Sequence, residues 1–221
     1  MSRPVLYKLD ASPPATAVRM LAEIIGLELE TKDLDVFKLE HKSPEFLKLN
    51  PMGTIPTLQD GDFIISESHA IIQYLLLKYG TKEQQEQLYP SDLRTRALIN
   101  QYLFFDTGVF YARRKNVVAP IFFGGAKGAT EKGLAAIDEA FTTLEAYLGD
   151  LHYLVGDRLT IADVSLGATA ASMRCIHTLD PVKFPRVARW LARLEQKPFF
   201  KLTLNAVDIL IGIVNSKIVS N

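Results

Sequence analysis

Ser12 stands in Asp10-Ala-Ser-Pro-Pro14, directly after a short apolar run and before a helix-like segment. A serine followed by proline at this place is typical of a helix N-cap, whose hydroxyl oxygen accepts a backbone N–H. The same hydroxyl could instead donate a hydrogen bond to an anion, which the helix dipole also favours. The local sequence favours the capping role and leaves a catalytic role open.

A second candidate is Thr54-Ile55-Pro56, which follows the helix-ending pair Asn50-Pro51. If the Ile55–Pro56 bond were cis, the sharp turn would leave the N–H and C=O of Ile55 free to pair with an extended peptide ligand. Only about 5–6% of such bonds are cis in folded proteins. The motif alone is therefore a weak indication.

Glu67 and Ser68 begin a further helix-like segment. N–H groups at a helix start and the Ser68 hydroxyl can bind a carboxylate, while Glu67 can bind an ammonium group. Together they would recognise the head group of an amino acid. Ordinary helix capping uses the same residue types, and His41 and His69 are more typical of surface histidines than of ligands.

Composition excludes several classes of function. The chain of 221 residues carries 25 Lys and Arg against 25 Asp and Glu, so a nucleic-acid partner is not expected. The single cysteine, Cys175, excludes an internal disulfide framework and fits a reducing compartment. Four scattered histidines show no zinc-binding spacing. No apolar run approaches ~20 residues and the N-terminus lacks a signal-peptide core, so we expect no membrane partner.

The first 80 residues alternate strand-like and helix-like segments, ordered β-α-β-α-β-β-α. The strands are expected at 5–9, 29–34, 57–58 and 63–65, and the helices at 12–26, 43–49 and 68–79, with Gly26 as a C-cap. The first βαβ unit predicts a parallel pair, and the hairpin at Asp60-Gly61 adds antiparallel strands. This is a small α/β domain with a mixed sheet.

Beyond a polar linker at 81–90, strand signals vanish. Apolar residues recur every three or four positions from Leu98 to Val109 and from Leu134 to Leu148. Thr160 and Asp163 have the spacing of a helix N-cap box, and prolines separate the last two helices. The predicted domains are therefore 1–80 (α/β), a linker at 81–90, and 91–221 (all-α).

Taken in order, these segments resemble the cytosolic glutathione transferases, most closely the insect delta/epsilon group and epsilon more than delta. The resemblance covers nearly the whole chain. It is carried by Leu6-Tyr7 with Ser12-Pro13-Pro14, Pro44-Glu45-Phe46 with Leu49-Asn50-Pro51, Thr54-Ile55-Pro56-Thr57-Leu58, Glu67-Ser68-His69-Ala70-Ile71 with Tyr74-Leu75, and Leu159-Thr160-Ile161-Ala162-Asp163. The joint order and spacing are specific, although no single motif is.

The resemblance implies a thioredoxin-like N-terminal domain, an all-helical C-terminal domain and a homodimer. It implies that Ser12 is the catalytic hydroxyl that stabilises the glutathione thiolate and that Pro56 is a cis-proline. Glutathione, the co-substrate, would then be bound by His41, Thr54, Ile55, Pro56, Glu67, Ser68 and His69, without a metal.

One position departs from the family pattern. The delta/epsilon sequences usually have histidine between the Asn-Pro and Ile-Pro pairs, where this chain has Gly53. A charge-assisted hydrogen bond is worth roughly 1.5–3 kcal/mol, so its loss would lower glutathione affinity about tenfold or more unless another group substitutes.

The electrophile is expected between the Ser12 loop and the long helix of the second domain, with the segment 204–210 as a partial lid. The residues expected around it are Phe110, Arg113, Arg114, Val117, Ile121 and Phe122. We therefore expect a cytoplasmic enzyme that conjugates glutathione to hydrophobic electrophiles in detoxification. The alternatives are a low-turnover binding protein of the same fold, or dehydrohalogenase, peroxidase or isomerase use of the same thiolate.

Overall fold

The N-terminal domain is built on a four-stranded sheet in the order β2-β1-β3-β4. The computed structural model describes residues 3–219. Its strands are β1 (Val5–Lys8), β2 (Glu30–Asp33), β3 (Thr57–Asp60) and β4 (Phe63–Ser66). β1 pairs in parallel with β2 and antiparallel with β3, which pairs antiparallel with β4. The predicted mixed sheet, with a charged edge strand at β2, is confirmed.

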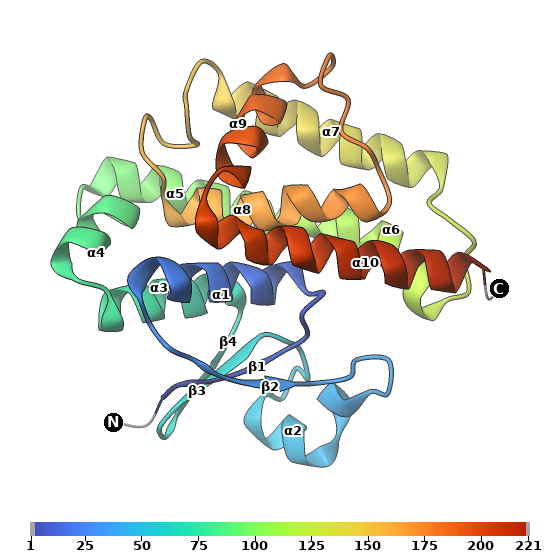
Figure 1. Ribbon diagram of the computed structural model, residues 1–221, viewed down its shortest axis with the longest axis horizontal. Coiled ribbons are helices and arrows are strands. Elements are labelled where there is room, and N and C mark those ends of the chain that lie inside the picture. The colour runs from blue at the N-terminus through green and yellow to red at the C-terminus, as the bar shows by residue number, and fades with distance from the viewer. Residues whose placement is uncertain (1–2, 220–221) are drawn as a thin grey trace.

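Helices α1 (Pro13–Ile25) and α3 (Ser68–Tyr79) cover one face of this sheet, and α2 (Pro44–Leu49) lies on the other side (Figure 1). Both predicted ends of α1 are confirmed. The Ser12 hydroxyl oxygen accepts from the Ala15 N–H, and Gly26 ends the helix in the left-handed conformation with φ of 71°. The buried face of α1 packs on α3 and, across the domain boundary, on α8.

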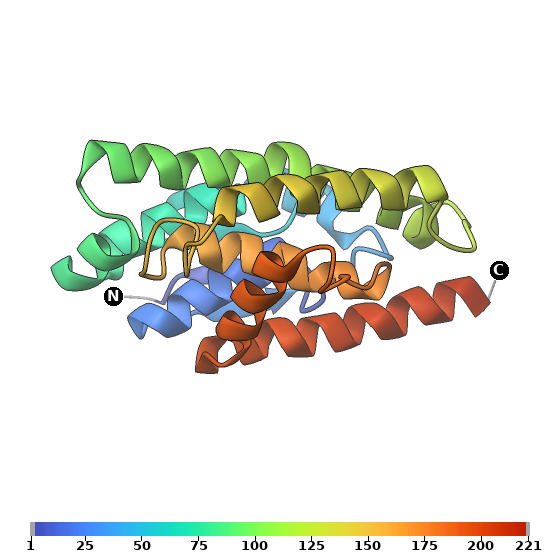
Figure 2. The same ribbon diagram turned by 90° about the horizontal axis from the view of Figure 1, so that it is seen from above.

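The C-terminal domain is entirely helical within the described residues. Its helices are α5 (Leu93–Phe105), α6 (Tyr111–Phe123), α7 (Glu131–Leu148), α8 (Ile161–Ser172), α9 (Pro185–Glu195) and α10 (Lys201–Val219). Every residue of α8 is buried, and Figure 2 shows this helix between the α5–α6 pair and α10. Thr160 and Asp163 form the predicted N-cap box. The core of the molecule is therefore centred on α8 and continues into the first domain through α1.

Two segments differ from the sequence expectation. The predicted linker contains a helix, α4 (Lys82–Leu88), which begins with a capping box between Thr81 and Gln84. The predicted long helix contains a π-helical turn, η2 (Asp106–Phe110), which joins α5 to α6 without a break. The described residues also contain three short 3-10 turns: η1 (Glu40–Lys42), η3 (Met173–Cys175) and η4 (Pro198–Phe200).

The last helix is more apolar than the sequence analysis expected. The segment Pro198–Val219 is long and apolar enough to cross a membrane, by length and composition alone. Its inner residues, including Thr203, Val207 and Leu210, are buried in this fold, and α10 packs on α1, α6 and α8. Many core helices of soluble proteins pass the same test. The expectation of no membrane partner stays a prediction.

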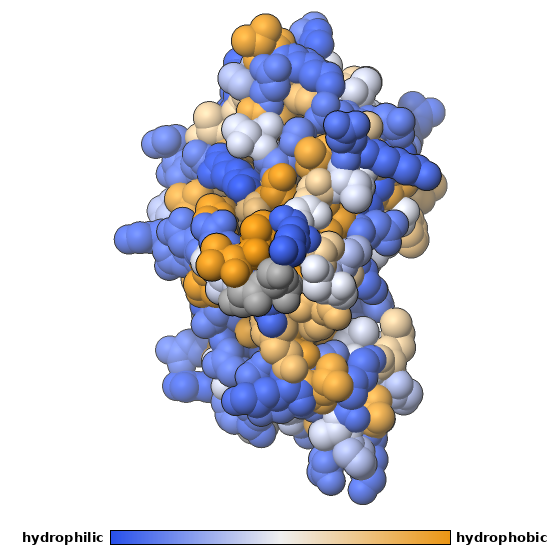
Figure 3. Space-filling view, turned by 90° about the vertical axis from the view of Figure 1, so that its right-hand side faces the viewer, coloured by the Kyte–Doolittle hydropathy of each residue, from blue (hydrophilic) through white to orange (hydrophobic). Residues whose placement is uncertain are grey.

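The ends of α6 and α10 meet the loop that follows β2. Phe37 in this loop contacts Phe122 and Phe123, with ring centroids 5.7 and 5.6 Å apart, and the Lys217 ammonium lies 5.0 Å from the centre of the Phe37 ring. Figure 3 shows apolar side chains gathered on this end of the molecule. The contact joins the two domains at a second place, away from the α1–α8 boundary.

Candidate active site

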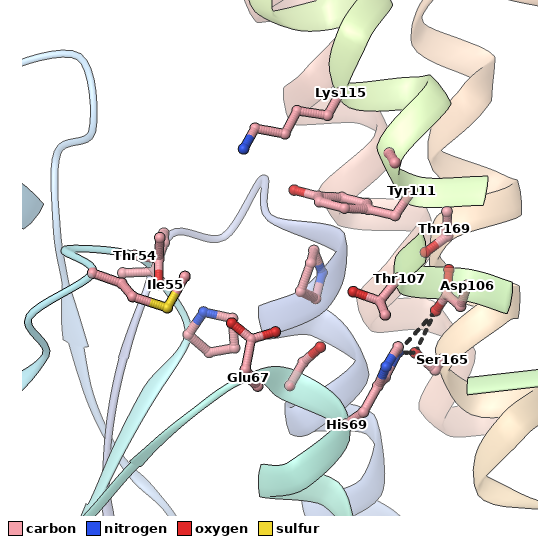
Figure 4. Close-up of a pocket in the computed structure, with 15 residues that line it drawn as sticks. Thr54, Ile55, Glu67, His69, Asp106, Thr107, Tyr111, Lys115, Ser165 and Thr169 are labelled. Carbon is pink, nitrogen blue, oxygen red and sulfur yellow. Dashed lines mark hydrogen bonds and ion pairs between the residues drawn. The ribbon is translucent and has the colours of Figure 1, made fainter. Parts of the chain in front are cut away.

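A cleft of about 320 Å³ lies between the two domains. The first domain contributes Pro14, Met52, Thr54, Ile55, Pro56, Glu67, Ser68 and His69 to its walls, and the second contributes Asp106, Thr107, Tyr111, Ala112, Lys115, Ser165 and Thr169. Figure 4 shows the polar side chains of both walls turned toward the space between them. The cleft therefore brings together six of the residues expected to bind glutathione.

The loop around Ile55 forms one wall. The Ile55–Pro56 peptide bond is cis, as the resemblance implied. The buried Asn50 amide fixes the loop by donating to the Thr54 carbonyl oxygen at 2.9 Å and to the Thr57 hydroxyl at 3.0 Å. Within residues 3–219, neither the N–H nor the C=O of Ile55 has a hydrogen-bond partner. An extended peptide can pair with both groups.

The start of α3 forms the neighbouring part of the same wall. Glu67 has a left-handed φ of 69°, a conformation that a non-glycine residue adopts at a cost of order 1–3 kcal/mol and that often marks a functional site. Ser68 is the first residue of α3, whose first backbone N–H groups have no intrahelical partner. An exposed carboxylate thus lies next to an anion-binding helix start. This arrangement complements an amino acid head group.

Ser12 lies two residues before Pro14, which lines the cleft, but Ser12 is not itself among the lining residues. Its hydroxyl oxygen accepts from the Ala15 N–H at 3.4 Å, a long hydrogen bond. Because a hydroxyl carries one donor and two acceptor positions, capping leaves the O–H free to donate. The capping and catalytic interpretations of Ser12 are therefore compatible in this geometry.

A polar cluster joins the two domains at the floor of the cleft. His69 Nε2 lies 3.1 Å from Asp106 Oδ2 and 2.7 Å from the Ser165 hydroxyl, which donates to the same Asp106 oxygen at 2.6 Å. Asp106 is 2% exposed, and its other carboxylate oxygen has no partner among the described residues. His69 thus bonds across the domain boundary. Sequence reasoning missed Asp106 and Ser165, although an aspartate on the apolar face of a predicted helix was a usable signal.

Comparisons with known proteins agree with this geometry. Residues 4–76 match the glutathione S-transferase N-terminal domain model and residues 127–193 match the C-terminal domain model. The chain is 36% identical to glutathione S-transferase D7 of Anopheles gambiae over 97% of its own length and 98% of the relative's. The chain belongs to the glutathione S-transferase family.

Solved structures of glutathione transferases have the same fold. A glutathione transferase homologue from Drosophila mojavensis, solved with bound glutathione, matches with a TM-score of 0.93 and 37% identity over 98% of each chain. An epsilon-class glutathione S-transferase from the housefly, Musca domestica, matches with a TM-score of 0.92 and 36% identity over 97% of this chain and 98% of that one. The thioredoxin-like and helical domains predicted from the sequence are confirmed, while the preference for epsilon over delta stays a prediction.

The six residues expected around the electrophile are not among those that line the cleft between the domains. Phe110 and Val117 lie in the main core, and Ile121 lies in a second apolar cluster with Ala11, Val118, Cys175, Leu210 and Val214. Phe122 contacts Phe37, Arg113 donates to the Ala136 carbonyl oxygen at 2.7 Å, and Arg114 is buried beside Cys175.

Helical periodicity explains this outcome. Apolar recurrence identifies the face of a helix that packs into the core, whereas the cleft receives the more polar neighbouring face with Thr107, Tyr111 and Lys115. The segment 204–210, expected as a lid, contributes Ala206, Val207 and Leu210 to the packing beside α1. In this structure those side chains pack mainly within the helical framework, and their contact with an electrophile stays a prediction.

His41 lies next to Gly53, outside the cleft lining. Its Nδ1 atom is buried without a partner in the described structure, and burial, with a smaller effect of Lys42, lowers the pKa of the imidazole. His41 is thus neutral at physiological pH in this arrangement. Between residues 3 and 219 no group of three or more His, Cys, Asp and Glu side chains is arranged to hold a metal ion.

Proposed function

We propose that this chain is a glutathione transferase that presents glutathione as a thiolate at Ser12 and transfers it to hydrophobic electrophiles. The observation that carries the proposal is the cleft wall, where the unpaired backbone groups of Ile55 lie beside the carboxylate of Glu67 and the start of α3. These groups match the backbone and the amino acid head of a γ-glutamyl peptide. A family member with the same fold was solved with bound glutathione.

The Ser12 hydroxyl supplies the first chemical requirement. A free thiol has a pKa of about 8.5, and only the thiolate attacks an electrophile. Lowering the pKa by ~2 units requires ~2.7 kcal/mol of preferential stabilisation of the anion. One O–H···S⁻ hydrogen bond together with the N-terminus of α1 is of this size. Ser12 forms no covalent intermediate, because the nucleophile arrives with the co-substrate.

The start of α3 supplies the second requirement, which is positioning. The Glu67 carboxylate would bind the γ-glutamyl ammonium group, and Ser68 with its neighbouring N–H groups would bind the carboxylate. Backbone pairing with Ile55 would then hold the cysteinyl sulfur toward Ser12 and the opposite wall. Holding two reactants in this way lowers the entropic part of the barrier.

The proposal includes a homodimer that acts in the cytoplasm on xenobiotic electrophiles. Several large apolar side chains on the outside of the molecule support the dimer, among them Phe63 on β4, Leu77 on α3 and Phe104 on α5, which are 42%, 47% and 73% exposed. The buried, unpaired thiol of Cys175 fits a reducing compartment.

Replacement of Ser12 tests the mechanism. We expect Ser12→Ala to lower conjugation of glutathione to an aryl halide by about tenfold or more, because the thiolate loses its hydrogen-bond donor. Ser43→Ala is the matched control: Ser43 also precedes a proline at the start of a helix and accepts from the Phe46 N–H at 3.2 Å. Both variants lose an N-cap, worth about 0.5–2 kcal/mol, but only Ser12→Ala should lose turnover.

The other outcomes separate the alternatives. Unchanged turnover in Ser12→Ala would remove Ser12 from the mechanism. If the wild-type protein binds glutathione in a calorimetric titration but conjugates no electrophile, the chain is a ligand-binding protein of this fold. Gly53 is the reason to test this second function. The resemblance leads us to expect a histidine there that helps to bind glutathione, and glycine has no side chain to replace it.

A further inference from the structure

A second pocket, in the helical domain, is lined by three arginines. It has a volume of about 260 Å³ and lies between the loop at 149–152, which follows α7, and the side chains of Arg186, Arg189 and Arg193 on α9. Figure 1 shows α7 and α9 on the side of the helical domain that faces away from the sheet. This arginine pocket shares no lining residue with the cleft between the domains. It is therefore a separate place on the molecule.

The spacing of the arginines places their guanidinium groups on one face of α9. Arg186, Arg189 and Arg193 are three and four residues apart, and side chains with this spacing lie one above the other on a helix. The neighbouring face of α9 carries Val187 and Trp190, which are buried in the core. Because core packing fixes the rotation of α9 about its axis, it also fixes the direction in which the three arginines point.

The three guanidinium groups use few of their hydrogen-bond donors within the protein. Arg193 Nη1 donates to the His152 carbonyl oxygen at 2.6 Å, and its guanidinium carbon lies 5.7 Å from the centre of the Tyr153 ring. Among residues 3–219, the side chains of Arg186 and Arg189 donate no hydrogen bond to another residue. A guanidinium group carries five N–H donors in a planar fork that matches a phosphate or carboxylate group. Most of the donors in this pocket therefore have no partner within the described part of the chain.

Two carboxylates lie near Arg186 without balancing the three cations. Glu145 is 3.5 Å from Arg186 Nη1, but its oxygens already accept from the backbone N–H groups of Arg186 and Val187 at 2.9 to 3.0 Å, so it caps the start of α9. Asp150 is 3.7 Å from Arg186 Nη2, and its side chain is 99% exposed, so this ion pair contributes little. Arg189 forms no ion pair with a described residue. The pocket therefore has an excess of positive charge, and its ligand donors are the guanidinium groups.

We propose that the arginine pocket binds the phosphate group of a small phosphorylated metabolite. Three guanidinium groups against the Asp150 carboxylate leave an excess of two positive charges, and a phosphate monoester carries about −1.5 to −2 near pH 7. Arg186 and Arg189 would donate to the phosphate oxygens, as arginine forks do to phosphate in general. The volume lies just below the range of about 300–1,000 Å³ typical of ligand pockets, which leaves room for a small organic group beside the phosphate. The inference does not depend on the transferase function.

Calorimetric titration of the full chain with inorganic phosphate and with glycerol 3-phosphate, at one ionic strength, tests the proposal. We expect both to bind saturably and to compete with each other. Arg189→Gln removes a charge at an exposed position without a partner in the described residues, and should weaken the affinity for both by about tenfold or more, because charge-assisted hydrogen bonds are lost. Arg94→Gln is the matched control. It removes the same charge from an exposed arginine on α5, outside the pocket, and should change either affinity by less than about twofold.

Three results would overturn the proposal. Heats that do not saturate with either compound would mean that the pocket binds no phosphate group, and saturation by inorganic phosphate alone would mean that it admits no ester. Equal losses in Arg189→Gln and Arg94→Gln would mean that the overall charge of the chain, and not this pocket, attracts the anion. The titration is repeated with saturating glutathione, which should leave the phosphate affinity unchanged. Competition between the two would place the phosphate in the cleft between the domains and would also refute the proposal.

Discussion

The backbone conformation at position 53 and the atoms packed around it leave room only for glycine. Its φ is 57°, and a Cβ atom added there would lie 2.7 Å from the His41 carbonyl oxygen and 2.9 Å from side-chain atoms of Leu47 and Lys42. The Lys42 ammonium donates to the neighbouring Met52 carbonyl oxygen at 2.7 Å, which draws η1 against this loop. The loop as folded here therefore has no room for a histidine side chain, which the resemblance led us to expect at this position.

A pair of alanine substitutions measures this constraint. We expect Gly53→Ala to lower the free energy of unfolding by about 2–4 kcal/mol, because a strained φ and a steric overlap add together. Gly125→Ala is the control, since Gly125 has a similar φ of 71° but open space around it, and should cost about 1–2 kcal/mol. Urea unfolding of both variants gives the comparison. Equal losses would contradict the steric argument.

Single residues of the candidate site could be predicted from the sequence where a short motif around them indicates their role. Ser12, Ile55-Pro56 and Glu67-Ser68 each occur in a short motif whose residue types specify a cap, a turn or a helix start. Asp106, Tyr111 and Ser165 lie in no such motif, and only the packing of α5, α6 and α8 brings them to the cleft. Their roles depend on tertiary contacts, which a single sequence does not contain.

At the scale of elements, the sequence largely predicts the order of the helices and strands. It does not predict helix α4 in the linker or the π-helical turn η2. The polar composition of 81–90 predicts a linker, but an exposed helix is also polar, and Thr81-x-x-Gln84 is a capping-box signal for α4. The π-helical turn η2 occurs in Asp-Thr-Gly-Val-Phe, which matches no local sequence motif for such a turn. It matters because an extra residue in a helical turn rotates everything after it by about 100°, and Tyr111 and Lys115 follow directly.

One buried carboxylate ties the hairpin of the sheet to helix α3. Asp60, at the end of β3, accepts hydrogen bonds from Tyr74, Lys78 and Tyr79 at 2.7 to 2.8 Å. Burial alone would raise the pKa of Asp60, but the donors outweigh burial and hold the pKa below its usual value. A carboxyl group with a lowered folded-state pKa stabilises the fold above its unfolded-state pKa. That stabilisation is lost as the pH falls through the folded-state pKa.

Asp60→Asn should therefore lower the free energy of unfolding by about 1.5–3 kcal/mol at pH 7, and the difference from wild type should shrink as the pH falls below about 4. Thermal or urea unfolding across this pH range measures it. Asp62→Asn is the control, because Asp62 is an exposed neighbour with no recorded hydrogen bond or ion pair in the described chain. A loss that stays constant with pH would show that the charge of Asp60 is not what matters.

The two domains behave as one structural unit because their contacts lie on both sides of the cleft. The α1–α8 packing and the His69–Asp106–Ser165 cluster join them at its floor, and Phe37 with Phe122 and Phe123 joins them at the far end. The N-terminal wall that would bind glutathione is therefore held in fixed relation to the C-terminal wall that would contact the electrophile. Such rigid placement of two reactants is what bimolecular catalysis requires.

The outer surface has exposed apolar side chains that could form the interface of the expected dimer. Leu98 and Phe104 on α5 are 43% and 73% exposed, so a large aromatic ring and an aliphatic side chain from one helix are left in contact with water. Exposed apolar side chains of this size are normal singly, but several on neighbouring elements indicate an interaction surface. We expect Phe104 to be buried against a second copy of the chain.

Phe104→Glu should shift the protein from dimer to monomer, because a buried unpaired carboxylate at an interface costs several kcal/mol. Size-exclusion chromatography with light scattering at micromolar concentration measures the change. The control is Val182→Glu, which adds the same charge at a side chain that is 88% exposed in the loop before α9. A wild-type protein that is already monomeric would refute the dimer. If Phe104→Glu stayed dimeric, the interface would lie on another face, and Leu77 and Phe63 would be the next positions to change.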